Sequence, residues 1–520
     1  MIIVTFNKPN FEYDVHSLLK AFFPEEKVQM FYTCGEEELS EENVACTAHA
    51  FDDEARAQLE EAQHVFEIDY EENKIQIDWN DGNTSHQISF DVDTADKQET
   101  RNKLKQNLYD MISEGLGIVL PWGTLTGIRP TKITMHLLES GMSEDAVYNY
   151  MKENYLASDE KIKLSIDIAR REKSLLSKID YENGYSLYIG IPFCPSTCLY
   201  CSFTSYPLAQ WKNQVDAYLD ALEKEIDFTA ERFADKKLNS IYIGGGTPTT
   251  LEPYQLDRLI KKIKSSFDLT YCVEFTVEAG RPDSITKDKL MVLKENGIDR
   301  ISVNPQTMKQ KTLDIIGRHH TVEDTIESFK IAREVGISNI NMDLIMGLPE
   351  EDIDDVRHTM EVLRELEPDN ITIHSLAIKR AARLTIFKDR YQDMQMVNTQ
   401  EHMDLCAKIC HEMGLEPYYL YRQKGMAGNM ENVGYAKAGM AGVYNILIME
   451  EKQTIMALGA GASTKFVLPE VNADGNRRIE RVENVKDVKN YLERIDEMIQ
   501  RKTDKMEEIK WHKARSLLME

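Results

Sequence analysis

The chain has 520 residues, of which 42% are hydrophobic, so it can bury the cores of several domains and does not have the composition of a disordered protein. Its 62 basic and 88 acidic side chains give a net charge of −26, which disfavours general binding to nucleic acid or to anionic membranes. No apolar run has the ~18 residues of a membrane span, the first residues do not resemble a secretory signal, and eight cysteines are too few for a disulfide scaffold, so we expect a cytoplasmic protein with reduced thiols.

The first 180 residues are expected to form two regions. Residues 1–115 have the pattern of an N-terminal α/β domain. Its expected elements are a strand at 1–6, a helix at 15–23 and a hairpin with strands at 74–79 and 85–92. Residues 116–180 begin with a stretch rich in glycine and proline and continue with two or three helical patterns, so we predict a helical linker region.

Residues 181–400 alternate regularly between short β-branched runs and longer amphipathic runs. The expected strands are 186–192, 240–243, 272–278, 300–304, 339–345 and 370–374. The expected helices between them are 215–233, 254–267, 286–296, 322–335 and 353–366. A closed barrel of this kind has eight such units, so six units predict an α/β fold with a partial (β/α)6 barrel, whose reactive groups lie at the carboxyl ends of the strands.

Residues 401–520 lose this regularity and are predicted to form a C-terminal α+β extension that covers the substrate. The expected elements are a helix at 401–413, a tyrosine-rich stretch at 418–422, a strand at 444–449 and a charged helical tail.

Three of the cysteines, Cys194, Cys198 and Cys201, lie within eight residues, directly after the first barrel strand. By composition alone this spacing arises by chance in about 2 of 1,000 such chains. Zinc usually takes four ligands and a [4Fe–4S] cluster usually takes four thiolates, yet no fourth Cys or His is near in the sequence. Three thiolates would leave one iron of an iron–sulfur cluster open to chelate the amino and carboxylate groups of S-adenosyl-L-methionine (SAM). A zinc knuckle or three buried thiols is the alternative.

The Cys-x3-Cys-x2-Cys motif, in a loop after the first strand of a six-unit partial barrel, resembles that of the radical SAM enzymes. The flanking residues 188–194 (Tyr-Ile-Gly-Ile-Pro-Phe-Cys) and 200–203 (Tyr-Cys-Ser-Phe) resemble the oxygen-independent coproporphyrinogen III dehydrogenase family. Residues 122–132 and the long N-terminal region are similar to its HemZ branch. The resemblance implies a [4Fe–4S] cluster on the three cysteines and SAM as cofactor, and the family can hold two SAM molecules per site.

Residues at the ends of the later strands fit the same cofactor. Glycines 244–246, after the second strand, let backbone groups approach a ligand. A strand-end carboxylate can accept two hydrogen bonds from a ribose diol, and an arginine can pair with the SAM carboxylate in fork geometry. The resemblance implies SAM contacts for Tyr188, Tyr200, Gly245, Gly246, Thr247, Glu278, Gln306, Arg318, Asp343 and Ala377. No side chain is assigned as an acid–base catalyst.

The chain departs from the family pattern at two places. Gly190 stands where many relatives have histidine. The heme-chaperone branch typically carries His-Asn-x-x-Tyr-Trp, whereas this chain has Glu431-Asn432-Val433-Gly434-Tyr435-Ala436. The missing His and Trp argue against heme carriage through that motif.

An anionic substrate would need local cations in a chain this acidic. Basic residues follow the last barrel strand and the tyrosine-rich stretch, at Lys379, Arg380, Arg383, Arg422 and Lys424. We predict that these five residues form a basic rim that binds substrate propionates, with Arg129 and Lys132 as weaker candidates. A solvated surface is the alternative for the rim.

By resemblance, the expected reaction is the radical SAM oxidative decarboxylation of two propionate side chains of coproporphyrinogen III to vinyl groups, which gives protoporphyrinogen IX in anaerobic heme biosynthesis. The alternatives are a heme chaperone and a radical SAM enzyme that degrades heme. The implied partners are the tetrapyrrole substrate and an external one-electron donor such as flavodoxin or ferredoxin, because the sequence has no flavin motif. We expect a monomer that neither spans a membrane nor binds nucleic acid.

Overall fold

The computed structural model describes residues 1–33, 48–50, 56, 58–59, 61–127, 129–202, 205–377, 382, 394–423, 430–471 and 477–511. The chain divides into two units, Met1–Asp167 and Ile168–Glu520. The four-part division expected from the sequence stays a prediction. No helix in the described ranges is long and apolar enough to cross a membrane.

The first unit contains a six-stranded sheet in the order β3-β2-β1-β4-β5-β6. Its strands are β1 (Ile2–Phe6), β2 (Val28–Tyr32), β3 (Ala48–Ala50), β4 (His64–Tyr70), β5 (Lys74–Asn80) and β6 (Ser85–Asp91). Ile75, Ile77 and Trp79 alternate with more exposed residues along β5 and are buried, as a strand with one covered face requires. Apolar residues of α1 (Glu12–Phe22) and α3 (Lys97–Leu116) belong to the same core. The predicted first strand, first helix and hairpin are thus confirmed.

The helical patterns after residue 116 are also confirmed. They correspond to α4 (Thr131–Glu139), α5 (Glu144–Tyr155) and α6 (Asp159–Leu176). Ser143 begins α5 as its N-cap, because its hydroxyl accepts a hydrogen bond from the amide of Ala146.

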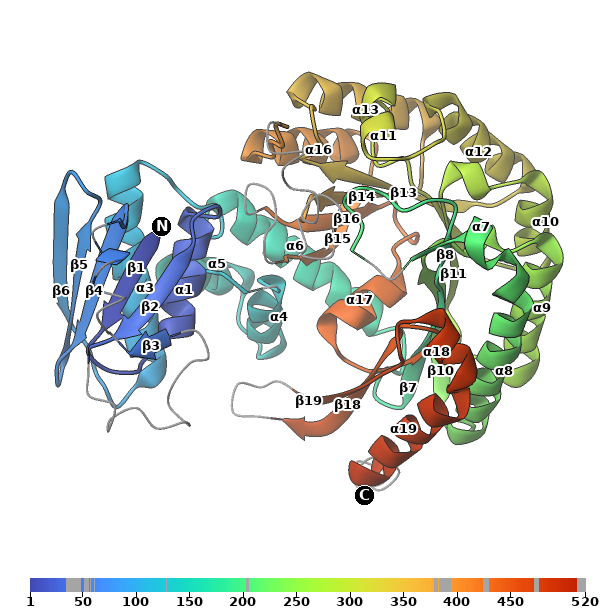
Figure 1. The fold of residues 1–520 in the computed structure, drawn as a ribbon, viewed down its shortest axis with the longest axis horizontal. Helices are drawn as coiled ribbons and strands as arrows, with labels where there is room; N and C mark the ends of the chain where they lie inside the picture. Colours follow the sequence, from blue (N-terminus) through green and yellow to red (C-terminus); the bar gives the residue numbers. More distant parts are fainter. Residues whose placement is uncertain are drawn as a thin grey trace. The chain divides into compact units, whose positions relative to one another are not determined.

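The second unit is built on six parallel strands that follow one another in the sheet in chain order. They are β7 (Gly184–Ile191), β10 (Lys237–Gly245), β11 (Glu274–Gly280), β12 (Arg300–Val303), β13 (Asn339–Met346) and β14 (Asn370–Ser375). The helices between them are α8 (Val215–Arg232), α9 (Pro253–Ser266), α10 (Lys287–Glu295), α11 (Gln310–Ile315), α12 (Val322–Val335) and α13 (Ile353–Leu366), and they line the outer side of the sheet (Figure 1). This is the partial (β/α)6 barrel that the sequence predicts.

The C-terminal extension adds strands to both edges of the barrel sheet. At one edge, β16 (Asn432–Ala436) pairs antiparallel with β14, and β15 (Glu416–Tyr421) pairs with β16. At the other edge, β17 (Thr454–Leu458) pairs in parallel with β7. Strand β18 (Ser463–Val471) pairs antiparallel with β17, and β19 (Arg477–Glu483) pairs antiparallel with β18. Helices α16 (Gln400–Glu412), α18 (Val488–Glu493) and α19 (Ile495–Glu508) also belong to the extension, and the short helix α7 (Leu208–Trp211) precedes α8.

The strand predicted at 444–449 is wrong, because this segment lies in helix α17 (Val443–Glu450). A short apolar run does not distinguish a strand from a helix that is covered on several sides. Here Tyr444 stacks on Tyr242 of β10, while Ile446 and Leu447 belong to one core cluster with tyrosines of β15. The helix is therefore apolar around most of its circumference and has no alternating pattern.

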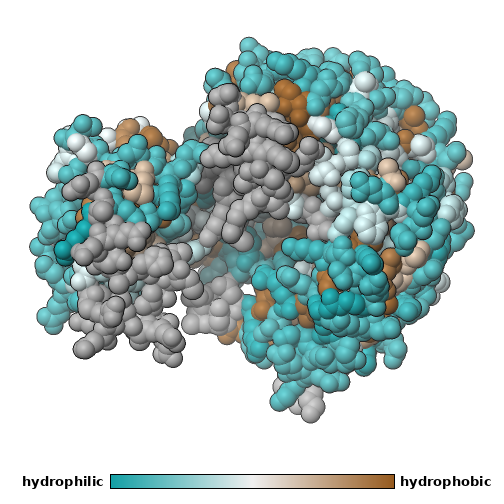
Figure 2. Space-filling view, viewed as in Figure 1, coloured by the Kyte–Doolittle hydropathy of each residue, from teal (hydrophilic) through white to brown (hydrophobic). Residues whose placement is uncertain are grey.

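On the face that Figure 2 shows, hydrophilic residues cover most of the outer helices of the second unit, and hydrophobic residues form small separate areas. This distribution agrees with the excess of charged side chains in the composition.

Candidate active site

A cavity of about 410 Å³ lies in the second unit among residues at the carboxyl ends of the barrel strands. All three clustered cysteines line it. Of the ten predicted SAM contacts, nine line it as well, namely Tyr200, Gly245, Gly246, Thr247, Glu278, Gln306, Arg318, Asp343 and Ala377. Tyr188 does not line the cavity and instead stacks behind it on Tyr242, with ring centroids 6.3 Å apart.

The cysteine loop, defined here as residues 194–201, is held by backbone hydrogen bonds on two sides. Cys194 ends the two-residue strand β8 (Phe193–Cys194). The amide of Thr247 donates to the carbonyl of Phe193 at 2.7 Å, and the amide of Leu199 donates to the carbonyl of Ile316 at 2.9 Å. The loop is thereby fixed between the glycine turn after β10 and the segment that carries Arg318.

The glycine turn after β10 is shaped by its contact with this loop. A Cβ atom on Gly246 would lie 2.6 Å from the carbonyl oxygen of Phe193 and 3.0 Å from Sγ of Cys194. Gly245 has φ +109°, a conformation that residues with a side chain rarely adopt. The close backbone approach expected at these glycines is therefore made in part to the cysteine loop itself.

The donor set fits a cluster better than it fits a single metal ion. Among the described residues, no three Cys, His, Asp or Glu side chains are grouped closely enough to hold one ion. A [4Fe–4S] cluster has a separate iron for each thiolate, so its ligands need not converge on a point. Thr247 Oγ1 donates to Sγ of Cys194 at 3.5 Å, and burial raises the pKa of the Cys194 thiol to about 11. The thiol is thus neutral at pH 7 until a bound metal displaces its proton.

Glu278, at the end of β11, is a buried carboxyl group next to stacked tyrosines. The hydroxyl of Tyr242 donates a hydrogen bond to Oε1 of Glu278, and the Tyr242 ring stacks on the Tyr444 ring with centroids 4.6 Å apart. Burial raises the pKa of Glu278 to about 7, although the hydrogen bond from Tyr242 acts in the opposite direction. The carboxyl group can therefore change its ionisation near neutral pH when a ligand binds.

Asp343, on β13, differs from Glu278 in its charge state. Burial raises its pKa, but the hydrogen bond and charge of His374 and the hydrogen bonds of Asn341 and Thr372 outweigh burial, so the pKa lies below its ordinary value. Asn341 Nδ2 donates to Oδ1 at 2.7 Å, and His374 Nε2 lies 3.8 Å from Oδ2. Asp343 is therefore ionised at neutral pH.

Gln306 and Arg318 each present a buried polar atom that has no hydrogen-bond partner among the described residues. These atoms are Oε1 of Gln306 and Nε of Arg318. Gln306 has φ +70°, a sparsely populated conformation that is held by backbone hydrogen bonds to Asp343 and Ile345. Arg318 uses its other nitrogens on the carbonyl of Asn304 and the hydroxyl of Tyr200. Since buried polar groups normally have partners, a polar ligand is expected here.

The predicted basic rim is mostly outside the described residues. Lys379, Arg380, Arg383 and Lys424 belong to ranges that the structure does not describe. Arg422 is only 6% exposed and does not line the cavity. Burial lowers its pKa, although the charge of Glu431 acts in the opposite direction. The rim therefore stays a prediction, and Arg422 lies inside the protein.

Sequence reasoning missed several cavity residues. One of them is Arg281, which follows β11. His374, which the sequence places at the end of the last barrel strand without a role, lies 3.8 Å from Asp343. Inward-facing residues one period before the strand ends also line the cavity, namely Tyr242, Thr276, Arg300, Ser302, Asn341 and Thr372. Most of these were available from the two-residue period of a strand, because they occupy the same face as the strand-end groups.

We expect SAM affinity to depend on the ionisation of Glu278. Since the ionised form is the better acceptor for ribose hydroxyls, SAM affinity should increase as pH rises through about 7. In Glu278→Gln the increase should disappear, and affinity at pH 8 should fall about 10- to 150-fold, the equivalent of roughly 1.5–3 kcal/mol. Equilibrium binding of SAM with the cluster kept oxidised measures both effects.

Glu351 provides a matched control for this prediction. Burial also raises its pKa to about 7, but it accepts a hydrogen bond from Thr307 at 2.5 Å and does not line the cavity. Glu351→Gln should keep both the affinity and the pH profile. A Glu278→Gln variant with the wild-type profile would show that Glu278 does not contact SAM.

Comparisons with known proteins show what the chain is similar to. A model of the Radical SAM superfamily matches residues 188–363. The chain is 40% identical to the oxygen-independent coproporphyrinogen-III oxidase-like protein HemZ of Bacillus subtilis. The match extends over 431 residues, which are 82% of this chain and 85% of HemZ. It is 33% identical to the heme chaperone HemW of the same organism, over 60% of this chain and 76% of HemW. It is 26% identical to the oxygen-independent coproporphyrinogen III oxidase of Escherichia coli, over 67% of this chain and 74% of that protein.

Proposed function

Because the chain belongs to the radical SAM superfamily and, within it, to the family of oxygen-independent coproporphyrinogen III oxidase-like proteins, we propose that it oxidatively decarboxylates two propionate side chains of coproporphyrinogen III. The product would be protoporphyrinogen IX. The observation that carries the proposal is that the three cysteines, the glycine turn and the strand-end polar residues all line one cavity.

The residues of this cavity have distinct proposed roles. Cys194, Cys198 and Cys201 would hold the [4Fe–4S] cluster. With SAM bound, such a cluster supplies an electron that breaks a carbon–sulfur bond of SAM and yields a radical able to take hydrogen from carbon. Glu278 would accept hydrogen bonds from the SAM ribose. Nε of Arg318, which has no partner in the described ranges, would contribute to binding the SAM carboxylate.

Each of the two propionates would undergo the same oxidation. The β-carbon loses one hydrogen atom, the carboxylate leaves as CO₂, and one further electron passes to an external one-electron acceptor, so that a vinyl group remains. The protein needs an external one-electron donor such as flavodoxin or ferredoxin to start each cycle. Its own residues orient SAM and substrate and limit the access of water to the reacting atoms.

A heme chaperone is the second candidate, because the chain is similar to HemW over 60% of its length. At the position of the chaperone motif this chain has Glu431 and Asn432. Glu431 is buried, and Asn432 accepts a hydrogen bond from the amide of Ser375 at 2.9 Å. The hydroxyl of Ser375 also donates to the carbonyl of Glu431 at 2.8 Å, so both residues hold the start of β16 against β14. The absence of the histidine favours the enzymatic proposal.

Anaerobic incubation of the iron- and sulfide-reconstituted protein with SAM, dithionite and coproporphyrinogen III tests the proposal. We expect the porphyrin pool, after oxidation, to gain protoporphyrin, and two CO₂ to appear for each molecule converted. Heme offered under the same conditions should be neither retained nor opened. Stable heme binding without turnover of coproporphyrinogen would instead support the chaperone, and an opened tetrapyrrole would support heme degradation.

A further inference from the structure

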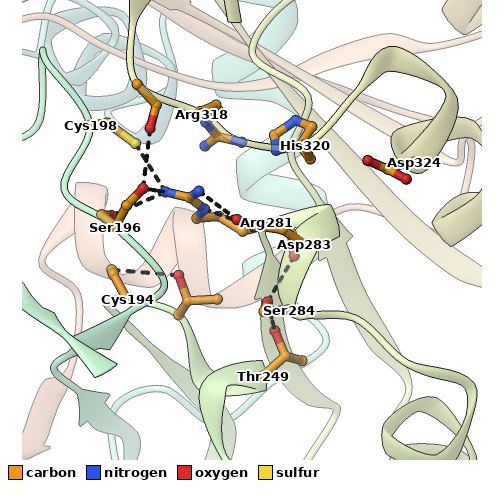
Figure 3. Close-up of polar contacts among 12 residues, drawn as sticks. Cys194, Ser196, Cys198, Thr249, Arg281, Asp283, Ser284, Arg318, His320 and Asp324 are labelled. Carbon is orange, nitrogen blue, oxygen red and sulfur yellow. Dashed lines mark hydrogen bonds and ion pairs between the residues drawn. The ribbon is translucent and has the colours of Figure 1, made fainter. Parts of the chain in front are cut away.

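Arg281 directly follows β11 and reaches the cysteine loop. The residue is 3% exposed. Its Nη1 donates to the carbonyl oxygen of Ser196 at 3.0 Å, to Oγ of Ser196 at 2.9 Å and to Sγ of Cys198 at 3.6 Å (Figure 3). On its other edge, Nε and Nη2 donate to the two carboxylate oxygens of Asp283 at 3.0 and 2.7 Å. The guanidinium therefore joins the loop to the turn after β11.

Two buried arginines near the cysteine loop use their N–H groups differently. In the part of the chain that the structure describes, Nε of Arg318 has no hydrogen-bond partner. Each of the three side-chain nitrogens of Arg281 has a protein acceptor. An arginine with a free donor is suited to bind a ligand, whereas one whose nitrogens are all engaged by the protein is suited to hold other groups in place.

Ser196 extends this connection across the loop. Its hydroxyl accepts from Arg281 and donates to the carbonyl of Gly317 at 3.1 Å. Gly317 immediately precedes Arg318, so a chain of hydrogen bonds runs from Asp283 through Arg281 and the loop to the segment that carries the ligand-binding arginine. Figure 3 shows Arg281 in the middle of this chain.

We propose that Arg281 is a positioning residue that fixes the cysteine loop and raises the reduction potential of the [4Fe–4S] cluster through its N–H group on Sγ of Cys198. The inference rests on the proposed cluster site and not on the tetrapyrrole substrate. One-electron reduction adds a negative charge to the cluster, and an N–H donated to a ligating sulfur stabilises that charge. The buried guanidinium charge acts in the same direction and is little screened by salt.

Asp283 is expected to lower the reduction potential of the cluster, in opposition to Arg281. Burial raises its pKa, but hydrogen bonds and charge from Arg281 outweigh burial and leave the pKa below its ordinary value, so Asp283 is ionised at neutral pH. Its negative charge offsets part of the positive charge of Arg281. Asp283→Asn removes that charge while the amide oxygen can still accept from Arg281, so the reduced cluster should become more stable.

The test is an anaerobic dithionite titration of the reconstituted full chain without SAM, with the reduced cluster followed by EPR. In Arg281→Gln the midpoint should fall by about 59 mV, the equivalent of a tenfold loss in the one-electron reduction equilibrium. In Asp283→Asn the midpoint potential should rise. Arg281→Lys keeps the positive charge but lacks the planar fork that contacts both the cysteine loop and Asp283. Its midpoint potential should therefore fall less than that of Arg281→Gln.

The matched control is Arg258→Gln on α9. Arg258 also pairs with two carboxylates, those of Asp220 and Glu223, but it does not line the cavity. Its removal should leave the midpoint unchanged. Opposite shifts for Arg281→Gln and Asp283→Asn support the electrostatic role, because a purely structural brace would move both variants in the same direction or only lower their iron content.

The outcomes also separate this inference from the proposed function. If the wild-type chain holds a cluster and Arg281→Gln and Asp283→Asn titrate like it, the inference alone is overturned. If Arg281→Gln loses its iron, the midpoint potentials of Asp283→Asn and Arg281→Lys test the inference instead. Potentials equal to that of the wild type in both variants would overturn it. A wild-type chain that binds no cluster would overturn the proposed cluster site together with the inference.

Discussion

Replacement of Cys198 by alanine is expected to reduce SAM cleavage to background and to remove most of the bound iron. The variant would leave two thiolates for a cluster that has no other cysteine along the described cavity lining. Cys198 is buried, and its sulfur accepts a hydrogen bond from Arg281, so the alanine would also remove one contact between that arginine and the cysteine loop. Iron and sulfide content, EPR of the reduced protein, and formation of 5′-deoxyadenosine measure the effect.

Cys272 provides the control for this variant. It is half-buried, its thiol donates to the carbonyl of Glu274 at 3.2 Å, and it does not line the cavity. Cys272→Ala should keep wild-type iron content and SAM cleavage. The assignment is wrong if Cys272→Ala or Cys406→Ala loses the cluster while Cys198→Ala retains it.

The barrel could be predicted because each of its elements is specified locally. The helix predicted at 353–366 coincides with α13, whose N-cap Asp352 accepts from the amides of Asp354 and Asp355. The strand predicted at 339–345 is one residue shorter than β13. In these segments the hydrophobic period and the residues at the ends indicate the same element, so the local sequence determines whether a helix or a strand forms and where it begins and ends.

The C-terminal extension could not be predicted to the same depth, because its structure depends on distant partners. Strand β17 is parallel to β7, and β16 is antiparallel to β14, so the extension covers both edges of one sheet. Such pairing leaves no periodic signal in either segment. Helix α17 was missed for a related reason, since it is covered by β10 and β15 on different sides.

The candidate site was predictable where its residues end strands. Glu278 and Arg318 line the cavity as expected, and Nε of Arg318 is one of several buried cavity atoms that have no hydrogen-bond partner among the described residues. Arg281 was missed because its role depends on the distance between two loops that are far apart in the sequence. The only sequence signal was a basic residue three positions after a strand-end glutamate, in Gly280-Arg281-Pro282-Asp283.

Removal of Lys502 is expected to cause the largest loss of stability in the second unit. Lys502 of α19 and Glu225 of α8 have side chains that are 0% exposed, and Nζ lies 2.5 Å from Oε1. Lys502 also donates to the carbonyl of Ala457, and Glu225 accepts from the amide of Gly459 at 2.8 Å, so the pair connects both helices to β17 and its following turn. Lys502→Met would leave a buried carboxylate without its counter-charge, which costs about 3–5 kcal/mol. Urea unfolding followed by circular dichroism measures the loss.

The cause of that loss is the isolated charge rather than the loss of attraction, because in the folded protein two buried ions gain little over a neutral pair. The double variant Glu225→Gln with Lys502→Met should therefore recover part of the stability, since the amide keeps an oxygen that can accept from Tyr491 and Gly459. Lys261→Met, which breaks a largely exposed pair with Asp257, should change the free energy of unfolding by no more than about 0.5 kcal/mol. A double variant as unstable as Lys502→Met would mean that packing of the lysine chain, and not its charge, stabilises this junction.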